Sequence, residues 1–200
     1  MLMKIFREVV ITVAIALAVF FALRLTVQSY DVYGPSMEPN FYQGYLVMVS
    51  KLAYHSSGPQ QGDVIVFNPP PAALGVCNVP PSHPPFIKRV IGLPGDIVEV
   101  KDGEVCINGT ALNEPYIMAL PGYVMPAVTV PQGEYFVLGD NRNNSCDSHV
   151  GWLVPRANII GKAWLLYWPP SKLGLVKHYT YLELGQVSEQ MLVLDNPVEA

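Results

Sequence analysis

The feature that most constrains this chain is an apolar run close to its N-terminus. Residues 9–23 are apolar except for Thr12, and continued to Val27 the run contains 19 residues. As a helix it would be roughly 28 Å long, close to the thickness of the hydrocarbon core of a bilayer. Arg24 lies near the far end, where its long side chain can carry the charge to the membrane interface. The run therefore predicts one transmembrane helix over 9–27.

The residues that flank this run predict its orientation. Lys4 and Arg7 precede it, which favours a cytoplasmic N-terminus at 1–8 and an exported remainder. A cleavable signal peptide is the main alternative, but residues 25–28 contain no small-x-small site. A buried core helix is the other alternative. We favour a retained anchor.

Composition limits the class of protein. A chain of 200 residues with 50% apolar content suits one folded domain with an anchor. The net charge of -4 and the scattered Lys and Arg residues exclude a nucleic-acid-binding class. Cys77, Cys106 and Cys146 lack metal-ligand spacing, and their odd number leaves at least one unpaired. Whether any two of them pair stays open.

After the apolar run the pattern is mainly that of β-strands. Alternating or continuous apolar segments predict strands at 45–49, 62–67, 86–91, 97–100, 104–107, 134–138 and 159–168. Asp102-Gly103 predicts a tight hairpin turn, and Asn108-Gly109 repeats the signal. Proline-rich residues 68–85 predict a surface excursion without regular structure. We expect a β catalytic domain over 28–180 and a tail over 181–200, with a weak helical pattern at 187–194.

The stretch 34–39 carries a candidate nucleophile, Ser36. Pro35 has a fixed φ and should hold Gly34 in an extended conformation, while Pro39 prevents an early helix. The hydroxyl is then presented on a stiff turn. Such residues also occur in ordinary turns, so the assignment depends on finding a base elsewhere in the chain.

Two residues are serious candidates for that base. His149 with Asp140 or Asp147 could complete a Ser-His-Asp triad, whereas His55, His83 and His178 lie in loops or near the tail. Lys88 stands within the apolar segment 86–91, where burial would favour the neutral amine. The alternative for Lys88 is a strand lysine that faces water. We favour Lys88.

Four motifs in order resemble bacterial type I signal peptidases, the membrane-bound Ser/Lys proteases that remove signal peptides from exported proteins. They are the nucleophile box at 34–39, a strand box at 62–67, a lysine box at 87–96 and a last box at 139–148. The resemblance implies a signal-peptidase-like β catalytic domain. It also implies that Ser36 is the nucleophile and Lys88 the general base, and that Ser145 orients the lysine amine.

The resemblance further implies supporting roles and a substrate pocket. Val32, Tyr33, Phe86 and Ile87 would line the pocket for the residues one and three before the cleaved bond, while Asp140, Arg142 and Asp147 would be structural. Three positions depart from the family pattern. Gly34 replaces a serine that donates to the oxyanion in some members, His149 replaces the arginine of Asp-Ser-Arg, and Gly151-Trp152 replaces Trp-Gly.

We therefore expect a one-anchor, mainly β serine endopeptidase of the cell membrane, with its active site outside. Its expected partners are the signal peptides of exported preproteins, the lipid bilayer and the export machinery, and it needs no metal or other cofactor. A membrane-tethered, inactive peptide-binding module is the alternative of another class. Self-cleaving repressors of the SOS response share the Ser/Lys scaffold, but they carry a DNA-binding helix-turn-helix where this chain has an apolar run.

Overall fold

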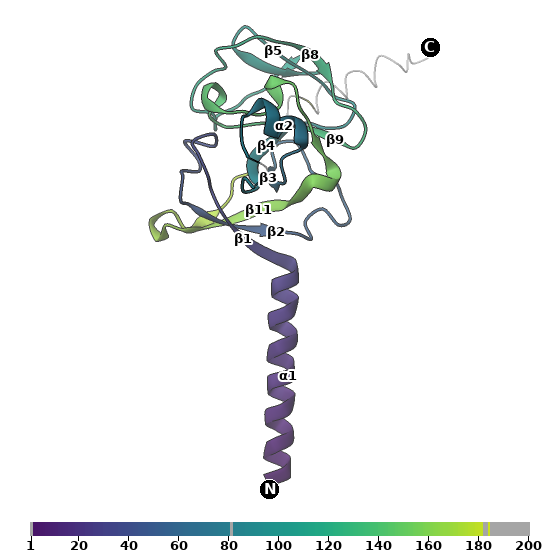
Figure 1. Cartoon of the computed structure of the whole chain (residues 1–200), viewed down its shortest axis with the longest axis vertical. Helices are drawn as coiled ribbons and strands as arrows, with labels where there is room; N and C mark the ends of the chain where they lie inside the picture. Colours follow the sequence, from purple (N-terminus) through teal and green to yellow (C-terminus); the bar gives the residue numbers. More distant parts are fainter. Residues whose placement is uncertain (1, 81, 182–183, 185–200) are drawn as a thin grey trace, which may run out of the picture.

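A long N-terminal helix extends away from a β-rich body (Figure 1). The computed structural model describes residues 2–80, 82–181 and 184, with the backbone alone at 2, 22, 23 and 25. Helix α1 (Leu2–Thr26) begins before the predicted span and ends one residue short of it, because Val27 starts a strand. Counting only the described residues, no helix is both long and apolar enough to cross a membrane. The predicted transmembrane span is not confirmed.

Among the described residues the larger sheet has eight strands, and every pairing in it is antiparallel. Its order is β1-β2-β11-β3-β4-β9-β10, with β12 paired to β11. Its strands are β1 (Val27–Asp31), β2 (Leu46–Ser50), β3 (Val64–Phe67), β4 (Phe86–Gly92), β9 (Glu134–Leu138), β10 (Val154–Pro155), β11 (Ile159–Trp168) and β12 (Gly174–Leu175). Because β3 and β4 are neighbours inside this sheet, Ile65 pairs with Lys88.

The smaller, four-stranded sheet has the order β7-β6-β5-β8. Its strands are β5 (Ile97–Lys101), β6 (Glu104–Ile107), β7 (Thr110–Ala111) and β8 (Met125–Thr129). The predicted hairpin is confirmed: Lys101 pairs with Glu104, and Asp102 and Gly103 have φ values of 53° and 79°. Positive φ at both central residues matches the twist of the flanking strands.

The segments between strands contain short helices. They are α2 (Pro71–Val76), η1 (Arg142–Asn144), η2 (Ser148–Val150), η3 (Arg156–Asn158) and η4 (Pro170–Lys172). The expectation that no regular element survives in 68–85 is wrong. Proline is tolerated in the first turn of a helix, where its missing N–H has no partner to lose, and Pro71 occupies that position in α2.

Three apolar clusters form the core. One contains residues of the smaller sheet, a second contains residues of β2, β3 and β11, and the third surrounds Phe67 and Trp152. The second cluster contains Met37 and Phe41 from the turn that follows β1. That turn is therefore anchored by buried side chains.

The mainly β prediction is confirmed, since the predicted strands all overlap observed ones. The short strands β1, β7, β8, β10 and β12 have too little apolar periodicity to be recognised in the sequence. The boundaries of the catalytic domain stay a prediction. The helical pattern predicted at 187–194 lies outside the described residues.

Candidate active site

The Ser36 hydroxyl stands on a tight turn that follows strand β1. The Glu38 N–H donates to the Pro35 carbonyl at 3.1 Å, and the Met37 side chain is fully buried. Gly34 has a φ of +76°, a left-handed value that strains any residue with a Cβ. The prediction of an extended Gly34 is therefore wrong. Glycine suits this position because it adopts a positive φ without the strain that a Cβ brings.

Two asparagines tie this turn to the polar run at 139–149. The Asn141 N–H donates to the Ser36 carbonyl at 3.0 Å, and Asn141 Nδ2 donates to the Pro35 carbonyl at 3.2 Å. Asn40 Nδ2 donates to Asp140 Oδ2 at 2.8 Å. Neither asparagine stands out in the sequence, except that Asn141 belongs to a run too polar for a core. Their contacts hold the nucleophile turn against the next wall of the site.

Lys88 reaches the nucleophile from strand β4. Its Nζ donates a hydrogen bond to Ser36 Oγ, and only 5% of the residue is exposed. Burial lowers the pKa of Lys88 to about 8, and the Asp147 and Asp140 carboxylates oppose that shift. At pH 7 about 9% of such lysines are neutral amines, against about 0.03% for a lysine in water. A neutral amine in this place could accept a hydrogen bond from the Ser36 hydroxyl.

Within the described residues, no histidine ring is hydrogen-bonded to Ser36. His149 Nδ1 lies 2.7 Å from Asp147 Oδ1, and its ring stacks on Tyr123 with centroids 4.2 Å apart. His178 Nδ1 accepts the Val64 N–H at 3.2 Å. The geometry supports the lysine rather than the triad.

Buried ion pairs frame the site. Arg89 Nε and Nη2 each lie 2.8 Å from a different oxygen of Asp140. Arg142 makes a second two-pronged pair with Glu114, with both N–O distances at 2.5 Å. Removing one partner of such a buried pair leaves an uncompensated charge, which costs about 3–5 kcal/mol. Glu114 has no signal in the sequence, because it lies 28 residues from Arg142 in an irregular segment.

Asp147, the third of the predicted structural residues, supports the end of strand β9. Its Oδ2 accepts the Gly139 N–H at 2.8 Å, while its Oδ1 faces His149. The carboxylate is fully buried. It therefore contributes negative charge near Lys88 as well as a backbone contact.

Ser145 lies beside the nucleophile turn, but its hydroxyl has no hydrogen-bond partner among the described residues. A Cβ built on Gly139 would lie 2.3 Å from Ser145 Oγ and 2.3 Å from the Ser36 carbonyl oxygen. The absence of a side chain at Gly139 thus allows Ser145 to approach the turn. The predicted hydrogen bond to Lys88 is not formed in this conformation, and the orienting role stays a prediction.

A cavity of about 220 Å³ opens over the Ser36–Lys88 pair. Three of the four residues predicted to line a pocket do line it, namely Tyr33, Phe86 and Ile87. Val32 is instead 2% exposed and packs in the core with Met37 and Val47. Successive residues of extended chain point to opposite sides, so Val32 faces inward where Tyr33 faces the cavity.

The proline-rich excursion forms the remaining wall of this cavity. Cys77, Val79 and His83 line it, and the His83 ring lies edge-on to Tyr33 and Phe86. A disulfide joins Cys77 to Cys146 with a Cα–Cα distance of 5.8 Å. Cys106 is buried and unpaired. The excursion is therefore attached to the segment directly after Ser145.

The backbone N–H of Ser36 is a candidate donor to an oxyanion. The Ser36 N–H makes no hydrogen bond within the described part of the chain, so it can donate to an oxyanion that forms beside Oγ. Gly34 offers no side-chain donor. In the same described part, no three His, Cys, Asp or Glu side chains lie close enough to hold a metal ion. The groups present suit nucleophilic catalysis on an acyl carbon.

The chain is similar to known proteins in sequence. Residues 4–168 match the family model "Signal peptidase, peptidase S26". Two probable signal peptidases I from Synechocystis, I-2 and I-1, are 43% and 48% identical over 155 and 147 residues, which cover 78% and 74% of this chain and 69% and 74% of theirs. A crystal structure of a signal peptidase I from Enterococcus faecalis V583 aligns at 32% identity with a TM-score of 0.41, covering 53% of this chain and 97% of that one.

Proposed function

Since this chain belongs to the signal peptidase family, peptidase S26, and is a serine endopeptidase that removes signal peptides from preproteins, we propose that Ser36 is its nucleophile and Lys88 its general base. The observation that carries the proposal is the contact between Lys88 Nζ and Ser36 Oγ. Burial of the lysine supports it, because a buried amine is more easily neutral.

The contact suggests a sequence of proton transfers. Neutral Lys88 takes the hydroxyl proton as Ser36 Oγ attacks the carbonyl carbon of the scissile bond. The oxyanion that results accepts a hydrogen bond from the Ser36 N–H. Lys88 then gives its proton to the leaving amine as the peptide bond breaks, which leaves an acyl-enzyme. Water, deprotonated by Lys88, hydrolyses the ester and regenerates the Ser36 hydroxyl.

The substrate side of the proposal rests on the cavity lined by Tyr33, Phe86 and Ile87. These side chains, with the wall from Cys77 to His83, leave about 220 Å³. The substrate residues one and three before the cleaved bond would have to share this space, which favours small side chains at both positions. The signal peptide is the proposed partner at this site, and the export machinery that delivers preproteins is proposed as a further one.

Helix α1 is proposed to hold the protease at the cell membrane, with its N-terminus cytoplasmic and the β body outside. Support comes from apolar side chains along the helix that the β body leaves uncovered, among them Val9, Leu17 and Phe21, each more than half exposed. Lys4 and Arg7 support the orientation. Protease treatment of intact spheroplasts should digest the β body, and survival of that body would contradict this orientation.

Ser36→Ala and Lys88→Met should each abolish cleavage of a preprotein by the detergent-solubilised full chain while leaving it folded. Because each removes one half of a unit that acts together, the double variant should be no worse than either single one. His149→Ala should keep substantial activity. If His149→Ala is as inactive as Ser36→Ala while Lys88→Met still cleaves, the Ser-His-Asp triad replaces the Ser/Lys pair.

The inactive peptide-binding module is the less favoured function. An inactive relative has no need of a buried lysine held against a serine hydroxyl, since the burial of an unpaired ammonium is unfavourable. Absence of cleavage in every preprotein tested, with tight binding retained, would favour the module.

A further inference from the structure

His149 is bonded to a carboxylate of the active site. Its Nδ1 lies 2.7 Å from Asp147 Oδ1. An ionised carboxylate can only accept hydrogen bonds, so Nδ1 carries the hydrogen. The ring stacks on Tyr123 with centroids 4.2 Å apart, and 19% of the side chain is exposed. His149 is therefore held in place and is still open to protons from solvent.

Asp147 connects His149 to the catalytic pair. Its Oδ2 accepts the Gly139 N–H at 2.8 Å. Gly139 is packed so closely on the nucleophile turn that an added Cβ would lie 2.3 Å from the Ser36 carbonyl oxygen. Burial lowers the pKa of Lys88, and the Asp147 carboxylate is the largest charge that opposes this effect. An uncompensated Asp147 therefore makes the Lys88 ammonium harder to deprotonate.

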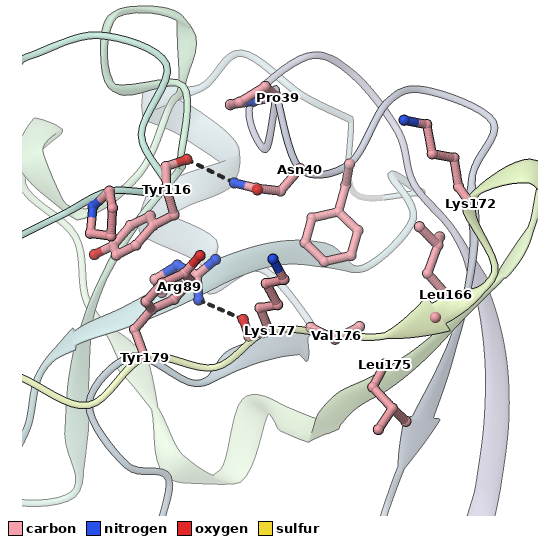
Figure 2. A pocket seen from close by; sticks show the side chains of 13 residues that line it. Pro39, Asn40, Arg89, Tyr116, Leu166, Lys172, Leu175, Val176, Lys177 and Tyr179 are labelled. Carbon is pink, nitrogen blue, oxygen red and sulfur yellow. Dashed lines mark hydrogen bonds between the residues drawn. The ribbon is translucent and has the colours of Figure 1, made fainter.

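Asp140, the other carboxylate that raises the pKa of Lys88, has a permanent counter-charge. Arg89 Nε and Nη2 each lie 2.8 Å from one of its oxygens, and arginine keeps its proton in proteins. Figure 2 shows how Arg89 is fixed: its Nη1 donates to the Lys177 carbonyl at 3.2 Å, and its guanidinium lies 4.2 Å from the centre of the Tyr116 ring. The compensation of Asp140 is therefore the same at every pH of interest.

The compensation of Asp147 depends on His149. Within the described part of the chain, His149 is the only basic side chain paired with this carboxylate. Burial, followed by the charge of Asp147, raises the pKa of the neighbouring Tyr123, which stays neutral. Arg142 and Glu114, which also act on Tyr123, neutralise each other as an ion pair. The histidine is thus the adjustable group beside Asp147.

We propose that His149 is a positioning residue for the cleavage reaction: by donating to Asp147 it offsets the negative charge that the Lys88 amine faces, and so favours the neutral amine. His149 is not among the residues that line the cavity over Ser36 and Lys88, so it acts through Asp147. This proposal rests on the role of Lys88 as general base, and its test distinguishes a failure of that role from a failure of the proposal itself.

Two variants of His149 keep different parts of its side chain. His149→Phe keeps a ring on Tyr123 and loses the donor, whereas His149→Arg keeps a cationic donor and loses the stacked ring. In both variants Asp147 retains its main-chain donors, the Gly139 N–H at 2.8 Å and the N–H of residue 149 at 3.3 Å. The carboxylate is therefore held in place while its side-chain partner changes.

The first measurement is the pH dependence of kcat/KM for one preprotein, with the full chain in detergent. His149→Phe should raise the midpoint by about 0.5–1 pH unit, because a compensating group near the carboxylate is lost. Cleavage at pH 7 should then fall roughly three- to tenfold, with the high-pH plateau unchanged. His149→Arg should have its midpoint at or below the native value. His55→Phe, at an exposed histidine outside the cavity, is the matched control and should leave the midpoint unchanged.

The second measurement is the titration of Lys88 itself, which does not require cleavage. In the full chain with lysine isotope-labelled at Cε, in neutral maltoside micelles, the Lys88 NMR signal is identified by its loss in Lys88→Met. Its midpoint should lie about 0.5–1 pH unit higher in His149→Phe than in the native chain.

An unshifted Lys88 midpoint in His149→Phe, with Lys88→Met inactive, overturns this proposal and leaves Lys88 as the base. The proposal is also overturned if His149→Phe behaves like the native chain and His149→Arg does not, because ring packing would then be the role of His149. Cleavage by Lys88→Met would instead overturn the role of Lys88, and this proposal with it.

Discussion

Lys88 and Arg89 are adjacent in strand β4, yet their cations meet opposite environments: Lys88 Nζ contacts the neutral Ser36 hydroxyl, and Arg89 is bound by both oxygens of Asp140. Burial lowers the pKa of both side chains, but for Arg89 the Asp140 carboxylate more than offsets burial and the pKa is raised. One strand thus carries a cation that can lose its proton and a cation that keeps it.

The low pKa of Lys88 predicts a stability penalty. Its folded value of about 8 lies below the ordinary 10.5, so the unfolded chain binds more protons between these pH values and stability rises with pH across them. Below pH 8 the buried ammonium costs about 3 kcal/mol. Lys88→Met should therefore raise the free energy of unfolding at pH 7 by about 1–3 kcal/mol and flatten its rise between pH 8 and 10.5.

Urea unfolding of the native protein and of Lys88→Met, at pH 7 and at pH 10, measures the difference in their free energies of unfolding. Lys162→Met is a suitable control, because Lys162 is paired with Asp63 at 2.5 Å and its removal should destabilise the chain. The prediction fails if Lys88→Met is less stable than the native protein and its free energy of unfolding depends on pH in the same way. Burial of the Lys88 ammonium would then not be unfavourable.

The same pKa predicts how cleavage depends on pH. Only the neutral amine can take the Ser36 proton, so kcat/KM should rise about tenfold per pH unit below pH 8 and level off above it. Initial rates on one preprotein from pH 5 to pH 10 would show the curve. A midpoint near 6.5 that disappears in His149→Ala would instead point to a histidine base.

Local patterns account for most of what could be predicted. The strand around Lys88 is recognisable because apolar residues surround it, and the Asp102-Gly103 turn because few residue pairs accept positive φ. The contact between Lys88 and Ser36 spans 52 positions. No local sequence pattern encodes a contact between residues so far apart in the chain. The pairing of Lys88 with Ser36 was predicted from the resemblance to a known family and from weighing the candidate bases.

Contacts between distant, irregular segments could not be predicted. Asn40 reaches Asp140 across 100 positions, and Cys77 joins Cys146 across 69. With three cysteines in the chain, any pair was equally open. The excursion at 68–85 was expected to be free surface because of its prolines, but the disulfide makes it a wall of the active-site cavity. Side-chain tethers of this kind depend on the assembled fold.

Removal of that disulfide should loosen the wall. Crosslinks that close loops of this length typically contribute about 2–4 kcal/mol, so Cys77→Ser with Cys146→Ser should lower the free energy of unfolding by about that amount. Because Cys77 and Val79 line the cavity, KM should rise more than kcat falls. Cys106→Ser, at a buried unpaired thiol, is the control and should leave KM unchanged. An unaltered KM in the double variant would mean that the wall does not touch substrate.

The Ser145 hydroxyl is buried and has no hydrogen-bond partner in the described chain. This allows its effect on stability and its effect on catalysis to be predicted separately. Its removal leaves no other buried group unpaired, so Ser145→Ala should change stability by less than about 1 kcal/mol. If the hydroxyl accepts from Lys88 during the reaction, kcat should fall about ten- to a thousandfold with little change in KM. Thermal unfolding and steady-state kinetics separate the two effects, and an unchanged kcat removes Ser145 from the site.

The lining of the catalytic cavity predicts which preproteins are cleaved. Ile87 is 6% exposed and lines the cavity with Tyr33 and Phe86, so a large substrate side chain must displace packed atoms. Overpacking of this kind typically costs about 1–3 kcal/mol, or roughly a five- to hundredfold loss of kcat/KM. Preproteins with Ala or Ser one and three positions before the cleaved bond should therefore be preferred over those with Leu or Phe. Ile87→Ala should relax this preference at one position more than at the other. Val32→Ala, in the core beneath, should lower stability and leave the substrate preference unchanged. Equal cleavage after Leu and Ala by the native chain would refute the pocket assignment and leave the Ser36–Lys88 pair to its own test.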